Sequence, residues 1–135
     1  MKKVRVTTKR REELLDVTRF VDETVRGSSI ESGVCVVYCP HTTAAVTINE
    51  GADPAVASDI VMGLDRLIPG DWDFRHMEGN SDAHMKASLV GPSETLLIDD
   101  GRLLLGTWQR IFFCEFDGPR ERSLYIHIVG TETSR

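Results

Sequence analysis

The stretch that decides the fold is GTWQRIFFCEFD, residues 106–117. In an extended chain, successive side chains point to opposite faces of the sheet. The two faces would be formed by the odd-numbered residues Gln109, Ile111, Phe113 and Glu115 and by the even-numbered residues Trp108, Phe112, Cys114 and Phe116. Because the middle of the stretch is apolar on both faces, it predicts a central strand, or a strand covered by another subunit.

Two polar side chains, Gln109 and Glu115, would stand near the core in this arrangement. A buried polar group without a hydrogen-bond partner costs about 1–3 kcal/mol on the scale of protein mutations. Each of the two therefore needs a partner, which is either another residue of the protein or a bound substrate. The sequence leaves both alternatives open.

The rest of the chain alternates short strand patterns with helical patterns. Strands are expected at residues 1–8, 13–17, 33–39, 44–48, 94–99, 103–117 and 122–129. Helices are expected at residues 18–27, from 54 to just before Pro69, and at 81–89, with capping signals at Thr18 and Asp53. Asp100-Gly101 predicts a hairpin turn. This order predicts a single α+β domain over residues 1–135 with a mostly antiparallel sheet.

Length and composition exclude several classes of protein. The chain has 135 residues, 41% of them hydrophobic and 27% charged, which suits one globular domain. Sixteen Lys and Arg against 21 Asp and Glu give a net charge of −5, which argues against a nucleic-acid partner. No apolar run approaches the ~20 residues of a membrane span, and none of signal-peptide length follows the basic N-terminus. The sequence predicts a cytoplasmic protein without a membrane partner.

The three cysteines, Cys35, Cys39 and Cys114, do not follow a disulfide pattern. In the strand pattern around Cys35 and Cys39, both side chains point to one face. We expect reduced, buried thiols that act as small apolar groups. Zinc ligation by Cys39 is the less favoured alternative.

Three of the four histidines, His41, His76 and His84, fall in polar segments beside carboxylates. His41 follows a buried strand in the run Pro40-His41-Thr42-Thr43, and Asn49 at the end of the next strand is expected on the same rim. A strand end can present an imidazole to a ligand on a rigid scaffold. The simpler alternative is a loop histidine that hydrogen-bonds a backbone carbonyl.

The segment RHMEGNSDAHMK, residues 75–86, holds two histidines, two carboxylates, an amide and two cations. The simplest interpretation is a capped helix with an Asp82–Lys86 ion pair, which leaves the preceding His- and Glu-rich loop unexplained. A phosphate site is one function that fits. The helix N-terminus offers N–H groups to an anion, and Arg75 and Lys86 would reinforce the binding.

Metal binding is the other function that fits this segment. Zinc could be held, with one coordination position left open, by His41, His76 and His84. The spacing of His76 and His84 does not identify such a site, and the fold would have to bring His41 close. The common glycine-rich phosphate loops, the HExxH motif and the nucleophile elbow are absent from the sequence.

The run Asp117-Gly118-Pro119-Arg120 predicts a turn, and Arg122 follows it. A surface turn with exposed arginines is the common case. The functional alternative is an arginine held on a rigid turn and aimed at a phosphate or a carboxylate.

These motifs together resemble the YjbQ-like family of secondary thiamine-phosphate synthases. The matching residues cover nearly the whole chain: residues 41–45 with Asn49-Glu50, residues 75–86, residues 106–109 and residues 115–120. The resemblance implies an α+β fold with a barrel-like sandwich of antiparallel strands and about three helices. It also implies a homotrimer with pockets near the subunit contacts. The implied reaction joins hydroxymethylpyrimidine diphosphate to thiazole phosphate, with pyrophosphate leaving.

For this reaction the site must stabilise the negative charge that departs with pyrophosphate. The residues expected to take part in catalysis are His41, His76, Glu78, His84, Lys86 and Glu115. Those expected to bind the phosphorylated substrate or its ion are Thr42, Asn49, Asn80, Ser81, Asp82, Gln109 and Arg120. A divalent metal is expected, either Mg²⁺ for the transfer or Zn²⁺ at the histidines, and no organic cofactor.

Three functions remain open at this point. The first is the transferase, which acts on small phosphorylated metabolites. The second is a metal-dependent hydrolase or lyase for another phosphorylated metabolite, which predicts stoichiometric zinc at the three histidines. The third is a non-catalytic trimer that binds an anion, which predicts stabilisation by the ligand without turnover. The density of His, Glu and Lys in residues 75–86 favours an enzyme.

Overall fold

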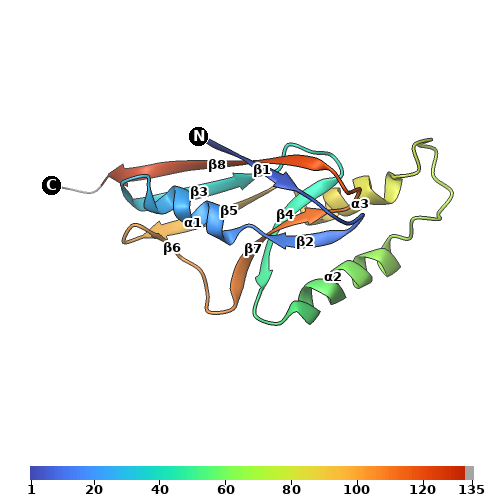
Figure 1. The fold of residues 1–135 in the computed structure, drawn as a ribbon, viewed down its shortest axis with the longest axis horizontal. Helices are drawn as coiled ribbons and strands as arrows, with labels where there is room; N and C mark the ends of the chain where they lie inside the picture. Colours follow the sequence, from blue (N-terminus) through green and yellow to red (C-terminus); the bar gives the residue numbers. More distant parts are fainter. Residues whose placement is uncertain (133–135) are drawn as a thin grey trace.

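The structure, a computed structural model, describes residues 1–132, which form eight strands and three helices (Figure 1). In chain order these are β1 (Lys2–Thr7), β2 (Glu13–Asp16), α1 (Thr18–Arg26), β3 (Ile30–Tyr38), β4 (Ala44–Glu50), α2 (Pro54–Leu67), α3 (Ser81–Val90), β5 (Ser93–Asp99), β6 (Arg102–Leu103), β7 (Gln109–Glu115) and β8 (Glu121–Glu132). Residues 133–135 of the predicted single domain lie outside the described part. Among the described residues, no helix combines the length and apolar character needed to span a bilayer.

The strands form two sheets. One has five strands in the order β1-β8-β3-β5-β6, and the other has three in the order β2-β7-β4. Each strand pairing in residues 1–132 is antiparallel. The predicted α+β class, with antiparallel strands in a barrel-like sandwich and three helices, is confirmed.

The central position predicted for residues 106–117 is confirmed by β7, which lies between β2 and β4. Its odd-numbered residues Ile111 and Phe113 enter the main core, between the two sheets and α1. Its even-numbered residue Cys114, with Phe116 just beyond the strand, enters a second core that α3 covers. The strand is therefore covered on both faces by its own chain, without the need for another subunit.

The prediction of one continuous strand over residues 103–117 is wrong. The chain ends β6 at Leu103 in the larger sheet, crosses through residues 104–108, and begins β7 in the smaller sheet. A tight turn makes the crossing, because the backbone N–H of Gln109 donates to the carbonyl of Gly106 and the side chain of Gln109 accepts from the N–H of Gly106. Gln109 is exposed in consequence, so its predicted place near the core is also wrong.

The predicted hairpin turn at Asp100-Gly101 is confirmed, because β5 pairs directly with β6 across these two residues. Both have positive φ, 52° for Asp100 and 75° for Gly101, as a two-residue hairpin of this kind requires. The predicted cap of α1 is not formed. Thr18 is instead the first helical residue, and its hydroxyl accepts a hydrogen bond from the backbone N–H of Ile111.

The cysteines are buried and reduced, as predicted. Burial raises the pKa of the Cys35 thiol to about 11, and burial also raises the pKa of Cys39. Thiols that hold their protons this firmly are poor metal ligands, because the thiolate is the ligand form. The less favoured zinc role of Cys39 therefore has no support in its surroundings.

The helices α2 and α3 differ in how they attach to the sheets. The predicted start of α2 is confirmed, since the Asp53 side chain accepts from the backbone N–H of Ala55 at 2.9 Å and Pro54 follows. However, α2 contains no buried residue, and it extends away from the sheets (Figure 1). By contrast, α3 packs against β4 through Ala83 and Ala87.

Two glycines test the close approach of strands β3 and β8. At Gly33 in β3, an added Cβ would lie 2.1 Å from the backbone oxygen of Val129 in β8, so Gly33→Ala forces these strands apart. We expect it to lower the free energy of unfolding by about 1–3 kcal/mol, the usual cost of overpacking. Urea denaturation measures the change.

The matched control is Gly63→Ala in α2, where an added Cβ meets nothing within 4 Å. This change should raise the free energy of unfolding by about 0.5–1 kcal/mol, because alanine favours a helix interior over glycine. Equal effects of the two substitutions would contradict the close approach of β3 and β8.

Candidate functional site

One hollow of the surface lies between α3 and the loop that joins β3 to β4. We call it the His41 hollow. It has a volume of about 320 Å³ and is lined by His41, Thr42, Ala44, His84, Ala87, Ser88 and Pro92. Its polar groups are thus two imidazoles and two hydroxyls, and among the described residues no carboxylate lines it. The packing of α3 on β4 brings these two segments together.

A second hollow, the His76 hollow, lies on the other side of His84. It has a volume of about 390 Å³ and is lined by Phe74, Arg75, His76, Ser81, His84 and Met85. The rings of His76 and His84 meet edge to face, with centroids 5.3 Å apart and planes at 86°. The three histidines singled out in the sequence therefore lie along one surface, with His84 shared by both hollows.

His41 is held in place by a backbone contact. Its Nε2 accepts a hydrogen bond of 2.9 Å from the N–H of Ser123 in β8. Burial, and next the charge of Arg122, lower the pKa of His41 below its usual value. The imidazole is accordingly neutral at physiological pH. The simpler alternative was a histidine that hydrogen-bonds a backbone carbonyl. The partner is instead a backbone N–H, so Nε2 accepts the hydrogen bond and does not donate it.

Glu78 approaches the histidine surface from the loop before α3. Its Oε2 lies 3.8 Å from Nε2 of His76, and the two side chains are 72% and 43% exposed. A pair this exposed contributes little to stability. The Glu78 carboxylate is therefore largely free in solvent beside His76, and Glu78 is not among the residues that line the His76 hollow.

Lys86 does not reach either hollow. Its side chain is fully buried, and its Nζ donates to Glu12 at 2.5 Å, to Asp65, and to Asp82 at 3.2 Å. Burial lowers the pKa of Lys86, but the hydrogen bonds to Asp65 and Glu12 outweigh burial and raise it. The lysine is a charged structural group, so its predicted contact with a departing phosphate is not supported by its position.

Asp82 belongs to the same cluster. Arg11 donates to its Oδ1 at 3.1 Å and to its Oδ2 at 3.3 Å, and Oδ2 also accepts from Lys86. Burial raises the pKa of Asp82, but the hydrogen bonds from Arg11 and Lys86 outweigh it, so the pKa is lowered. The carboxylate therefore remains ionised and fully engaged with its own chain.

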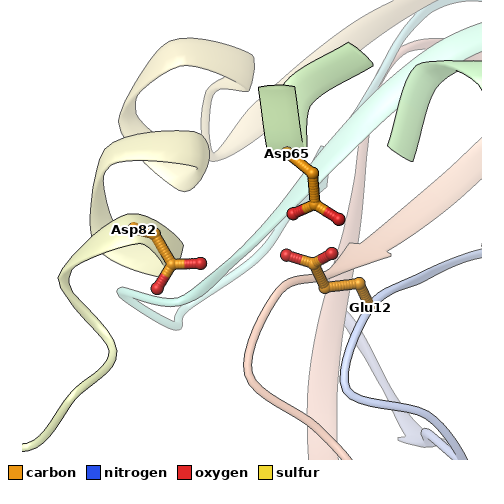
Figure 2. A group of neighbouring side chains, drawn as sticks. All are labelled: Glu12, Asp65 and Asp82. Atoms are coloured by element: carbon orange, nitrogen blue, oxygen red, sulfur yellow. The ribbon is translucent and has the colours of Figure 1, made fainter. Parts of the chain in front are cut away.

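The three carboxylates around Lys86 raise the question of a metal. Figure 2 shows Glu12, Asp65 and Asp82 converging from the β1–β2 connection, α2 and α3. One oxygen from each lies within 4.8 Å of the others, the kind of donor set that suits a hard cation. However, the Lys86 ammonium donates to all three, so this space does not fit a metal.

The histidines of one chain do not form a metal centre either. Among the described residues, only Glu12, Asp65 and Asp82 form a set of three side chains close enough together to hold a metal ion. His76 and His84 are neighbours, but the lone pair of His41 Nε2 is engaged by Ser123. The described residues of one chain therefore do not fit the resident Zn²⁺ or Mg²⁺ that the sequence suggested.

Glu115 has the partner that the sequence required, and the partner is structural. Arg122 donates to both of its oxygens, at 2.8 and 2.5 Å, and Thr8 and the N–H of Asp117 complete the set. Glu115 is fully buried. Burial raises its pKa, but the hydrogen bonds from Arg122 and Thr8 outweigh burial and lower it. A direct catalytic role for Glu115 would require one of these bonds to break.

The turn after β7 is also occupied by its own chain. The guanidinium of Arg120 donates to the backbone oxygen of Asp117 at 2.8 Å and to its carboxylate at 3.0 Å. The same carboxylate accepts from Nδ2 of Asn80, which precedes α3. Asn80 and Arg120 thus position the start of α3 and do not line either hollow. The Oδ1 of Asn80 is buried and has no partner among the described residues.

Asn49 and Gln109 lie elsewhere. They sit at the far end of β4 and the near end of β7, where Asn49 pairs with Arg110 and Glu50 with Gln109. His41 precedes the opposite end of β4, and seven strand residues span roughly 20 Å. The prediction that Asn49 closes on the same rim as His41 is therefore wrong, because the two ends of a strand cannot share a rim.

The family model described as UPF0047 protein YjbQ-like matches residues 2–131. This chain belongs to the YjbQ-like family. A UPF0047 protein of Methanocaldococcus jannaschii is 55% identical over 128 residues, which cover 95% of this chain and 93% of that protein. The UPF0047 protein YugU of Bacillus subtilis is 49% identical over 131 residues, which cover 96% of this chain and 99% of that protein. The predicted membership of the YjbQ-like family is confirmed.

Solved structures agree with the YjbQ-like fold. A conserved YjbQ/UPF0047 protein from Clostridium acetobutylicum has a TM-score of 0.94 at 46% identity and covers 96% of this chain and all of that one. A protein of unknown function from Sulfolobus solfataricus has a TM-score of 0.93 at 33% identity, with 96% of each chain covered. These similarities establish the family and the fold, and they name no activity.

In this YjbQ-like chain, the residues of the sequence motifs divide into two groups. The surface group surrounds the two hollows and consists of His41, Thr42, His76, Glu78, Ser81 and His84. The framework group holds the surrounding segments in place and consists of Asn80, Asp82, Lys86, Glu115 and Arg120. Residues 75–86 therefore contribute to both groups, and motif membership alone does not separate them.

The partners of the framework group are not apparent from the sequence. Glu12, Asp65 and Arg11 carry no signal in the sequence, because their partners on α3 lie far along the chain. Arg122 does carry a signal. Arg122 lies two residues before Leu124 and four before Ile126, so its side chain points to the same buried face of β8. A buried arginine needs an acidic partner, which the alternation alone could have indicated.

Lys86 provides a test of the framework. Lys86→Met leaves the carboxylates of Glu12 and Asp82 without their buried cation. We expect the free energy of unfolding to fall by about 3–5 kcal/mol, as when one partner of a buried ion pair is removed. Chemical denaturation measures it. Lys9→Met, at an exposed lysine, is the matched control and should change stability by less than about 0.5 kcal/mol. A well-folded, equally stable Lys86→Met protein would contradict the structural role.

Proposed function

We propose that this YjbQ-like protein is an enzyme that acts on small phosphorylated metabolites at the surface around His84. One observation carries the proposal. His84 lines both hollows, and so joins His41 and Thr42 on one side to His76, Ser81 and Arg75 on the other. Imidazoles, hydroxyls and a guanidinium are groups that hold phosphoryl oxygens and transfer protons.

The start of α3 supports phosphate binding in the His76 hollow. Its N-cap residue, Asn80, makes no side-chain capping hydrogen bond, and its amide turns to Asp117. The first turn of a helix carries N–H groups and a partial positive charge, both of which favour an anion. Ser81 and the exposed Arg75 line the hollow beside this turn.

The reaction we propose is the one that the family resemblance implies. The pyrimidine diphosphate loses pyrophosphate from its methylene carbon as the C–O bond breaks, and the thiazole nitrogen forms the new C–N bond. Arg75 and the first turn of α3 would stabilise the charge on the departing pyrophosphate. His76 and His84 would donate protons or hydrogen bonds to its oxygens. Mg²⁺ would enter with the diphosphate, the usual way that this ion reaches phosphoryl-transfer sites.

A homotrimer is part of the proposal. The outer face of the larger sheet carries an apolar row across three strands, formed by Leu97, Val34 and Val129, which are neighbours in register. Leu97 and Val129 are 55% and 56% exposed. A second copy would cover this row.

The oligomer is tested by light scattering during gel filtration. We expect a mass three times the 15.1 kDa of one chain. Leu97→Glu should reduce the mass, because a charge would then be buried at the contact. Leu104→Glu is the matched control, since Leu104 is equally exposed, at 56%, in the loop after β6. A wild type with the mass of one chain would contradict this part of the proposal.

The activity is tested by thiamine-phosphate formation from the two phosphorylated precursors, with Mg²⁺ and with chelator. We expect turnover by the wild type and a loss of about 10²-fold or more in His84→Ala, the usual effect of removing a general acid or base. His127→Ala, at an exposed histidine of β8, is the matched control and should keep the wild-type rate. Each variant is first checked by circular dichroism.

The outcomes separate the possible functions. Equal rates in His84→Ala and the wild type would place the activity outside the His84 surface. No turnover by the wild type, together with tight stoichiometric zinc, would favour a metal-dependent hydrolase or lyase. Stabilisation by pyrophosphate without turnover would favour a non-catalytic anion-binding protein.

A further inference from the structure

The hydrogen bond between Ser123 and His41 replaces a backbone hydrogen bond that is missing between β3 and β8 of the larger sheet. The last pair that joins β3 to β8 is Tyr38 with Tyr125. If β3 continued, residue 40 would lie opposite Ser123, but residue 40 is proline and the strand stops. The N–H of Ser123 donates to Nε2 of His41 at 2.9 Å instead. The imidazole therefore takes the place of a backbone carbonyl.

A buried ion pair holds both sides of this bond. Arg122, next to Ser123, donates to Glu115 and also to the hydroxyl of Thr43 at 2.9 Å and its carbonyl at 3.4 Å. The loop that carries His41 and the strand that carries Ser123 are thus tied to the same guanidinium.

The direction of the bond determines which ring nitrogen carries the proton. A nitrogen that accepts a hydrogen bond has no hydrogen of its own, so in a neutral imidazole the other nitrogen carries it. The proton of His41 is therefore on Nδ1. No group within residues 1–132 accepts a hydrogen bond from that Nδ1, and His41 lines the hollow that it shares with His84. The burial of His41 and the adjacent Arg122 cation favour the neutral ring.

We propose that His41 is a neutral hydrogen-bond donor, which offers its Nδ1–H to a phosphoryl or carbonyl oxygen in the His41 hollow. This inference rests on the proposed function for the identity of the hollow as a ligand site. Donors preorganised toward an oxygen stabilise charge that develops on it, and a neutral imidazole can act in this way. Thr42 and Ser88 add hydroxyls to the same lining.

The assignment excludes two other roles for His41. A general base needs a lone pair that faces the ligand, and the lone pair of His41 faces Ser123. A metal ligand needs the same, so metal coordination would require the bond to Ser123 to break. Glu115, Arg122 and Ser123 act on the chemistry only through His41, and are positioning residues.

The first test is the tautomer, read by long-range proton–nitrogen NMR of the ¹⁵N-labelled protein at neutral pH. We expect His41 to show one protonated nitrogen, Nδ1. The exposed His127 is the internal reference, because no hydrogen bond to its ring constrains it within the described part of the chain. A proton on Nε2, or on both nitrogens, would overturn the assignment whatever the protein binds.

The second test uses variants that keep one half of the imidazole. His41→Asn places an amide N–H near the position of Nδ1, whereas His41→Gln places its amide near Nε2 and loses the donor. Titration with inorganic phosphate, followed by the amide shifts of Thr42 and His84, gives the dissociation constant. We expect it to rise about tenfold in His41→Gln, as for the loss of one charge-assisted hydrogen bond, and less than about threefold in His41→Asn.

The control and the possible outcomes distinguish the donor role of His41 from the proposed function. His127→Gln should leave the phosphate titration unchanged. Equal weakening in His41→Asn and His41→Gln would overturn the donor role. No phosphate binding by the wild type would count against the proposed function, while the NMR tautomer would still decide the state of His41.

Discussion

The structure depends on one buried ion pair, between Glu115 of β7 and Arg122 of β8. These strands belong to different sheets, so the pair joins the two halves of the barrel-like sandwich. Removing two charges from water costs several kcal/mol per ion, and only a complete set of hydrogen bonds offsets it. Thr8, Thr43 and the N–H of Asp117 complete the set here. The residues that satisfy the ion pair therefore also determine where the loops around His41 run.

A second charged cluster does the same for the helices. The Lys86 ammonium binds carboxylates from the β1–β2 connection, α2 and α3, and Arg11 donates to both oxygens of Asp82. The histidine surface lies outside both clusters, on segments that they hold. These two clusters of charges thus build the frame, and the side chains that line the two hollows offer mainly imidazoles and hydroxyls, together with the guanidinium of Arg75.

The sequence predicts the fold better than the site, for a physical reason. The alternation in residues 109–116 reports burial on both faces, and Asp100-Gly101 reports a turn, because both signals are local. The crossing from β6 to β7 at Gly106 was not predicted, because a single glycine within a strand pattern does not show that the chain changes sheets there. Lys86 was predicted to face a ligand because Glu12 and Asp65 are distant in the chain. The three histidines singled out in the sequence line the two hollows, but the N–H donor to His41 comes from a residue 82 positions away, which no local pattern indicates.

The exposure of α2 has a consequence for how the molecule moves. Local opening costs least where few apolar groups are buried, and α2 buries none. Its described hydrogen bond to another element is that of Asp65 to Lys86, and Leu64 packs, partly buried, against the second core. The chain leads from α2 directly into the loop that carries His76. Of the three helices, α2 is therefore the one whose local opening should cost least, and the loop that carries His76 would move with it.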